Sequence, residues 1–169
     1  MTTSELLLQD FDAEMAGTRR TLERVPNDNP GYKCHDKSMP MGRLAMHVAA
    51  LPVLAKYILT EPGMDLANSK LPQADLTFTT TDALLILFDN AAKEARTALA
   101  AASDDDLVVS WKFTFGEHLI SEFSRSKTYR LMFFNHLIHH RAQLGVYLRL
   151  NDLPVPGLYG PSADEPFQA

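Results

Sequence analysis

The chain has 169 residues, which is long enough to bury the core of one domain, so residues 1–169 are expected to form a single domain. A formal net charge of −5 and the lack of a basic run argue against binding to nucleic acids or anionic membranes. One cysteine excludes an internal disulfide and favours the reducing cytoplasm. Neither a signal peptide nor an apolar run as long as a membrane span is predicted.

The first half of the chain predicts two long helices. The first, residues 2–24, begins with Thr2 and Glu5 at the spacing of a capping box and continues with an apolar stripe. The second is expected over residues 40–59, where Pro40 stands at an early position that needs no amide donor. Residues 61–79 contain two prolines and a glycine, which favours a long crossover connection along the side of a bundle.

The second half predicts two more helices, at residues 82–102 and 124–150. Threonines 79–81 can cap the first of them, and an acidic turn at 103–106 follows it. Residues 107–123 are rich in Val, Phe and Ile and partly alternate, so they predict either a small hairpin or an irregular lid. Four helices with few strands predict an all-α fold, namely a four-helix bundle.

The last helix carries three of the six histidines. His136 and His140 are four residues apart, so they lie about 40° apart on one helical face, where two imidazoles can bind one metal ion. His139 lies roughly 100° from His140 and is less suited to share that ion. On spacing alone, two helical histidines without a metal are an equally good interpretation. A stable site needs a third ligand, and His47 inside the second helix is the natural one.

Four segments in this order form a recognisable combination: TRRTLERVP (residues 18–26), KSMPMGRLAMH (37–47), NHLIHHRAQL (135–144) and VPGLYGPSADE (155–165). The combination resembles the DinB-like superfamily, which includes the YfiT-like metal-dependent hydrolases. The resemblance covers nearly the whole chain. It implies an up-down-down-up four-helix bundle with a long crossover between helices 2 and 3, often as a homodimer. It also implies one divalent metal held by three histidines, which by motif are His47, His136 and His140. The family often has glycine in place of Ala142, a change that is well tolerated on a helix.

Three imidazoles are neutral ligands, so a bound ion keeps its full charge and has at least one position for water or substrate. Zinc and nickel both suit imidazole. Such a site supports hydrolysis or thiol transfer, and characterised relatives resemble the second case because they use low-molecular-weight thiols. A metal-dependent enzyme acting on a small molecule or thiol is therefore the first hypothesis. The alternative is a non-catalytic metal-binding or stress-related bundle that acts through its dimer surface.

Several polar residues are candidates for a role beside the metal. A hydrolase needs a general base, and Glu117 and Glu122 precede the fourth helix, although surface charges on a lid are the commoner role of such residues. Gln143 and Tyr147 share the helical face of the histidine pair. They are expected either to orient a bound ligand or to pack and hydrogen-bond beside the histidines.

The remaining histidines and the cysteine are expected to be structural. Cys34 and His35 favour ordinary loop residues, because no second cysteine could complete a soft metal site with them. His118 is expected to cap a turn. His139 is expected to form hydrogen bonds within the bundle or at a dimer face, and Arg141 to pair with an acidic residue rather than with a substrate.

Overall fold

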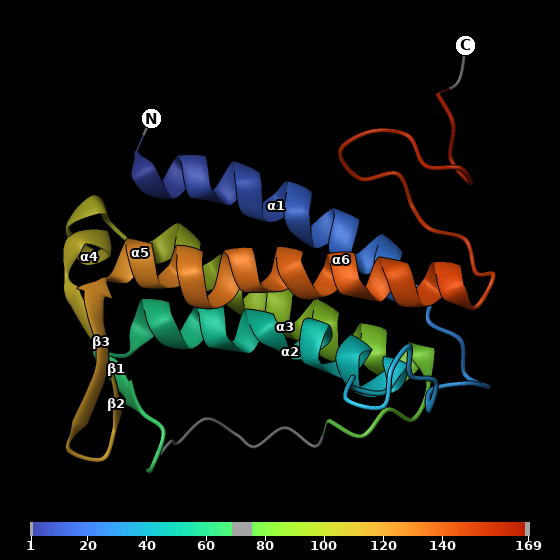
Figure 1. The fold of residues 1–169 in the computed structure, drawn as a ribbon. Coiled ribbons are helices and arrows are strands. Elements are labelled where there is room, and N and C mark those ends of the chain that lie inside the picture. Colours follow the sequence, from blue (N-terminus) through green and yellow to red (C-terminus); the bar gives the residue numbers. More distant parts are fainter. Residues whose placement is uncertain (1, 69–75, 168–169) are drawn as a thin grey trace.

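The structure is a computed structural model that describes residues 2–68 and 76–167, and it is mostly helical (Figure 1). Its long helices are α1 (Thr3–Leu22), α2 (Met41–Thr60), α3 (Thr81–Ala101) and α6 (Asn135–Leu150). Between α3 and α6 lie the short helices α4 (Asp104–Val108) and α5 (Arg125–Thr128) and the π-helical segment η1 (Tyr129–Phe134). These bounds confirm the four predicted helical stretches and divide the last of them into three segments.

Side-chain caps begin four of the described helices, among them α5, where the Ser124 hydroxyl accepts from the Lys127 amide. The Thr2 hydroxyl accepts from the Glu5 amide while the Glu5 carboxylate accepts from the Thr2 amide, so the predicted capping box is present. The Thr80 hydroxyl caps α3. Ser103 and Asp106 form a second capping box at α4, so the acidic run at 103–106 serves to begin a helix.

The four long helices lie side by side, and α1 and α6 run in one direction while α2 and α3 run in the other (Figure 1). Helix α2 packs against α3 and α6, and α1 packs against α3 and α6. Because α2 and α3 run the same way, the last turn of α2 and the first turn of α3 lie at opposite ends of the helices (Figure 1). The predicted crossover between α2 and α3 includes residues 69–75, which lie outside the described part of the chain.

A three-stranded sheet lies at one end of the helices, in the order β1 (Gly63–Asp65), β2 (Ser110–Phe115) and β3 (His118–Ser124). β1 pairs in parallel with β2, and β2 pairs with β3 in an antiparallel hairpin. The hairpin alternative for residues 107–123 is correct. The expectation of an all-α fold is correct only in part, because this small sheet accompanies the helices. β1 depends on a glycine, because a Cβ atom on Gly63 would lie 2.7 Å from the Lys112 carbonyl oxygen.

The sheet is attached to the end of α2 through one carbonyl group. The buried Trp111 indole donates to the Glu61 carbonyl at 3.1 Å, and the Arg125 guanidinium donates to the same carbonyl at 3.2 Å. Arg125 also donates to the carbonyl of Asp106 in α4. These bonds satisfy backbone acceptors at helix ends, which would otherwise be left without partners.

The core lies between the long helices, and α2 contributes more of it than any other element. Its buried residues include Met41, Leu44, Val48, Leu51, Ala55 and Ile58. Within the described ranges α2 alone is long and apolar enough to cross a membrane, but 61% of its apolar 18-residue stretch is buried inside the fold. This degree of burial is typical of a core helix.

A buried ion pair connects α6 to α1. The Arg141 side chain is 2% exposed, and its guanidinium lies 2.6 Å from the Glu14 carboxylate. It also donates to the Glu14 carbonyl and to the hydroxyls of Thr18 and Tyr159. The Tyr159 hydroxyl in turn donates to the Glu14 carboxylate. The expectation that Arg141 pairs with an acidic residue is therefore confirmed.

Replacing Arg141 by methionine is expected to lower the free energy of unfolding by about 3 kcal/mol, because it leaves the Glu14 carboxylate buried without a cation. Urea denaturation followed by circular dichroism measures this loss. The matched control is Arg149→Met, which removes an ion pair with Asp164 whose arginine side chain is 48% exposed. This control should change stability far less. Equal losses in the two variants would contradict the role given to Arg141.

Candidate metal centre

Three histidine side chains converge between α2 and α6. One ring nitrogen from each of His47, His136 and His140 lies within 4.8 Å of the others. The Nε2 atoms of His47 and His136 are 3.3 Å apart, and the His140 ring centroid lies 4.6 Å from each of the other two. All three side chains are half-buried, so solvent can reach them. The structure thus brings together the three residues that were predicted.

The local structure of each helix explains this convergence. His136 and His140 lie one turn apart in α6, which runs antiparallel to α2, and His47 faces them from α2. The π-helical segment η1 ends directly before α6, where the Asn135 amide donates to the Arg130 carbonyl five residues earlier. Such a turn changes the angular position of every residue that follows it, and π-turns are frequent at functional sites.

Two hydrogen-bond acceptors fix the tautomer of the α6 histidines. The His136 Nδ1 atom lies 3.2 Å from the Met132 carbonyl oxygen, and the His140 Nδ1 atom lies 2.7 Å from the Gln143 side-chain oxygen. A carbonyl oxygen can only accept, so each Nδ1 carries the hydrogen and each Nε2 keeps its lone pair. Metal-binding histidines usually show this arrangement, with the second ring nitrogen held by an acceptor.

The spacing of the ring nitrogens fits a metal ion. Zinc–nitrogen bonds of about 2.0–2.1 Å in a tetrahedral site place two ligand nitrogens roughly 3.3–3.4 Å apart. The Nε2 atoms of His47 and His136 are 3.3 Å apart. Two lone pairs directed at each other across this distance repel unless a proton or a cation lies between them. Bringing the third imidazole to the same spacing requires a shift of about 1.5 Å or less.

Burial favours the neutral, metal-binding form of His47 and His140. Burial, followed by the neighbouring histidines and Arg43, lowers the pKa of His47 to about 4. Burial is also the largest cause that lowers the pKa of His140, and the hydrogen bond to Gln143 opposes it. At neutral pH, protons therefore compete weakly with a metal ion for these two imidazoles.

The carboxylates predicted as bases lie elsewhere. Glu122 accepts a hydrogen bond from Ser110 at 2.6 Å and lies 4.0 Å from the Lys112 ammonium on the hairpin. Glu117 is exposed in the turn of that hairpin. Within residues 2–68 and 76–167, no carboxylate belongs to the histidine cluster. The interpretation of both glutamates as surface charges is thus the better one.

The two polar residues predicted on the face of the histidine pair have structural contacts. The Gln143 side-chain oxygen accepts a hydrogen bond from His140 Nδ1. The Tyr147 hydroxyl donates to the Met39 carbonyl at 2.9 Å, which connects α6 to the loop before α2. Met132 and Arg43 were not predicted as part of the site. The spacing of four residues between Arg43 and His47 is a signal in the sequence that could have identified Arg43.

The other histidines and the cysteine lie outside the cluster. His139 is exposed, although its ring centroid lies 4.9 Å from that of His140. His35 accepts a hydrogen bond from the Lys37 amide, and Cys34 lies 3.5 Å from the Ser38 hydroxyl. His118 is exposed at the start of β3. Cys34 and His35 are thus polar loop residues, as expected. The turn cap expected of His118 and the hydrogen bond expected of His139 stay predictions.

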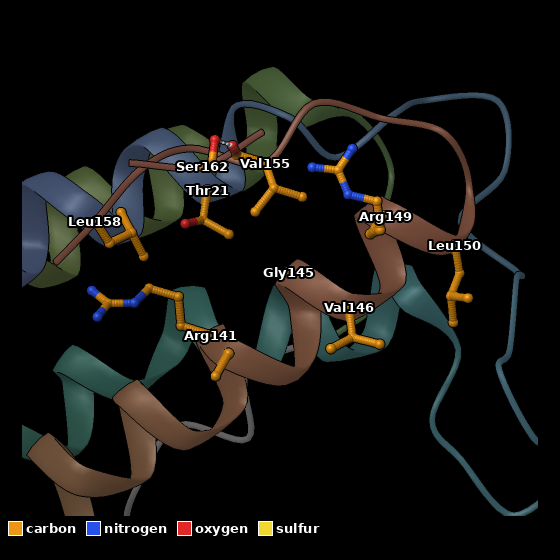
Figure 2. A pocket seen from close by; sticks show the side chains of 10 residues that line it. Thr21, Arg141, Gly145, Val146, Arg149, Leu150, Val155, Leu158 and Ser162 are labelled. Carbon is orange, nitrogen blue, oxygen red and sulfur yellow. Dashed lines mark hydrogen bonds between the residues drawn. The ribbon is translucent and has the colours of Figure 1, made fainter. Parts of the chain in front are cut away.

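A cavity of about 390 Å³ lies on a different side of α6, between this helix, α1 and the chain after α6 (Figure 2). It is lined mainly by apolar groups, among them Ala142, Val146, Val155 and Leu158. Its polar groups are already engaged: Ser162 donates to the Val155 carbonyl (Figure 2). Arg149 forms an ion pair with Asp164. None of the three clustered histidines lines it, so it is not part of the candidate metal centre.

Two solved structures resemble this fold. A DinB-like protein from Bacillus cereus has a TM-score of 0.69 at 22% identity, with 90% of this chain and 95% of that chain covered. A DinB-like protein from Bacillus subtilis has a TM-score of 0.69 at 19% identity, with coverages of 90% and 97%. No family model matches the chain, and no curated protein matches it. At these identities the likeness of this chain to the two DinB-like proteins is one of fold.

The contact between Gln143 and His140 makes a testable prediction. Gln143→Leu should lower the affinity for a divalent ion by about 10- to 100-fold, because the His140 ring loses the acceptor that orients it. Competition with a chromophoric chelator measures the affinity. The control His139→Ala removes the neighbouring exposed imidazole and should leave the affinity unchanged. A loss in the control, or none in Gln143→Leu, would contradict this assignment of the ligands.

Proposed function

We propose that the protein is a metal-dependent enzyme in which His47, His136 and His140 hold one divalent ion, zinc or nickel, and that it acts on a small-molecule thiol. One observation carries the proposal: three half-buried imidazoles converge, and two of them have their Nδ1 sides occupied by acceptors. The Nε2 atoms of these two imidazoles thereby keep their lone pairs for a metal ion. The DinB-like fold is compatible with this function but does not establish it.

The chain's own residues prepare this site in two ways. The Met132 carbonyl and the Gln143 amide orient two of the imidazoles, and burial keeps His47 neutral. When bound, a divalent ion with three neutral ligands keeps its charge and lowers the pKa of a thiol or water that coordinates it. The half-burial of the cluster leaves access for a substrate.

The neighbourhood of the cluster favours thiol chemistry over hydrolysis. Hydrolysis by a metal and a base needs a general base within hydrogen-bond reach of the attacking water. In the described part of the chain no carboxylate joins the cluster, and Glu122 is occupied by Ser110 and Lys112. A thiol that coordinates a metal loses its proton without a separate base. A thiol transferase therefore does not require the general base that a hydrolase would need at this site.

The alternative function, a non-catalytic metal-binding bundle, predicts a metal face closed by surrounding side chains. The half-burial of all three histidines favours the enzyme instead.

We also propose that the long helices form an up-down-down-up bundle of one domain, and that the protein is a cytoplasmic homodimer. The helix directions support the topology. Exposed apolar residues on α6 and η1, such as Val146, Leu150 and Leu131, support a self-association surface.

Elemental mass spectrometry of the untagged, purified protein tests the metal site. We expect close to one divalent ion per chain in the parent and loss of the ion in His140→Ala, because two histidines form too small a ligand set for stable binding. His35→Ala, which removes a loop histidine outside the cluster, should retain the ion. A parent chain that holds no ion after reconstitution with zinc or nickel would refute the proposed function.

A further inference from the structure

Arg43 differs from the other arginines of this protein. Each of the others makes an ion pair, a hydrogen bond or a ring contact: Arg19, Arg20, Arg24, Arg96, Arg125, Arg130, Arg141 and Arg149. Arg43 is exposed, and no described residue forms an ion pair or hydrogen bond with it. The chain has 21 acidic against 16 basic residues, so carboxylates are not scarce. An arginine left without one in such a chain is a candidate for binding an external anion.

The position of Arg43 places this free cation beside the histidine cluster. Arg43 and His47 are four residues apart in α2, so they share a helical face and are separated by a rise of about 6 Å. One helical turn therefore separates the Arg43 side chain from the His47 imidazole. A ligand in contact with the cluster therefore lies within range of the guanidinium.

The backbone that carries Arg43 is held firmly. The Gly42 amide donates to the Pro30 carbonyl at 2.8 Å, and the Met41 amide donates to the Tyr32 carbonyl at 2.8 Å. Gly42 is also closely packed, because a Cβ atom there would lie 2.8 Å from side-chain carbons of Phe78 and Pro30. Binding a ligand at Arg43 would thus restrict side-chain rotamers without first having to order the backbone.

We propose that Arg43 binds a carboxylate of the substrate, so that the substrate is an anionic thiol whose sulfur faces the three histidines. The inference rests on the proposed function and adds the substrate's charge to it. A guanidinium stays protonated at all physiological pH values and matches a carboxylate with two parallel hydrogen bonds. A fixed cation beside a divalent ion is unfavourable in the empty site, and an anionic ligand offsets the repulsion.

A pair of thiols that differ in charge alone tests the inference. The protein is loaded with cobalt(II), whose absorption spectrum reports a coordinated thiolate, and is titrated with 4-mercaptobutyrate and with its neutral amide. We expect the parent to bind the carboxylate about fivefold more tightly than the amide. Arg43→Gln should abolish this preference, and Arg43→Lys should retain part of it. All variants should bind the same amount of cobalt, which shows that the site remains folded.

Lys93→Gln is the matched control. Lys93 is an exposed residue of α3, and its replacement changes the net charge of the protein by the same amount. It should keep the preference of the parent. Equal affinities for both thiols in the parent, or a preference that survives Arg43→Gln, would overturn the role of Arg43 while leaving the thiol function intact. If neither thiol changed the cobalt spectrum of the parent, the thiol function itself would be refuted together with this inference.

Discussion

The candidate site depends on how α6 is rotated about its own axis, and the buried Arg141–Glu14 pair fixes that rotation. Consecutive helical residues point about 100° apart, so Arg141 and His140 leave α6 on different sides. The Arg141 guanidinium is 2.6 Å from the Glu14 carboxylate of α1 and is 2% exposed. A planar group with several fixed donors can satisfy its partners in few orientations, whereas apolar contacts tolerate sliding. With Arg141 held against α1, His136 and His140 are directed at α2.

The same histidines are prepared for a ligand before one arrives. The Met132 carbonyl and the Gln143 amide select the tautomer of the two α6 imidazoles, and burial disfavours the charged form of His47. Imidazoles that are already oriented lose little rotational freedom on binding an ion, which is the physical meaning of preorganisation. The π-helical segment contributes because it sets the angle at which α6 begins.

Local patterns allowed much of this fold to be predicted. The capping box at Thr2, the long helices and the shared face of His136 and His140 follow from residues only a few positions apart. The short strand β1 could not be predicted, because its three residues are held by pairing with β2 almost fifty positions later. The π-turn could not be predicted, because one extra residue in a helical turn shifts the apolar pattern by a single position and has no compositional signature. The acceptor role of Gln143 depends on a side-chain rotamer, which the sequence does not specify.

The overall charge of the protein constrains how the site can select an anion. A net charge of −5 gives the molecule a field that repels anions at long range, so electrostatic steering would not raise the association rate of an anionic thiol. Selection therefore has to occur at contact distance, through a short-range hydrogen-bonded pair with Arg43. Added salt screens long-range repulsion and contact attraction to different extents, because exposed charges separated by more than about 8–10 Å are largely screened at physiological ionic strength. Moderate salt should thus speed the approach of an anionic thiol while it weakens the contact with Arg43, and the two effects oppose each other in the measured affinity.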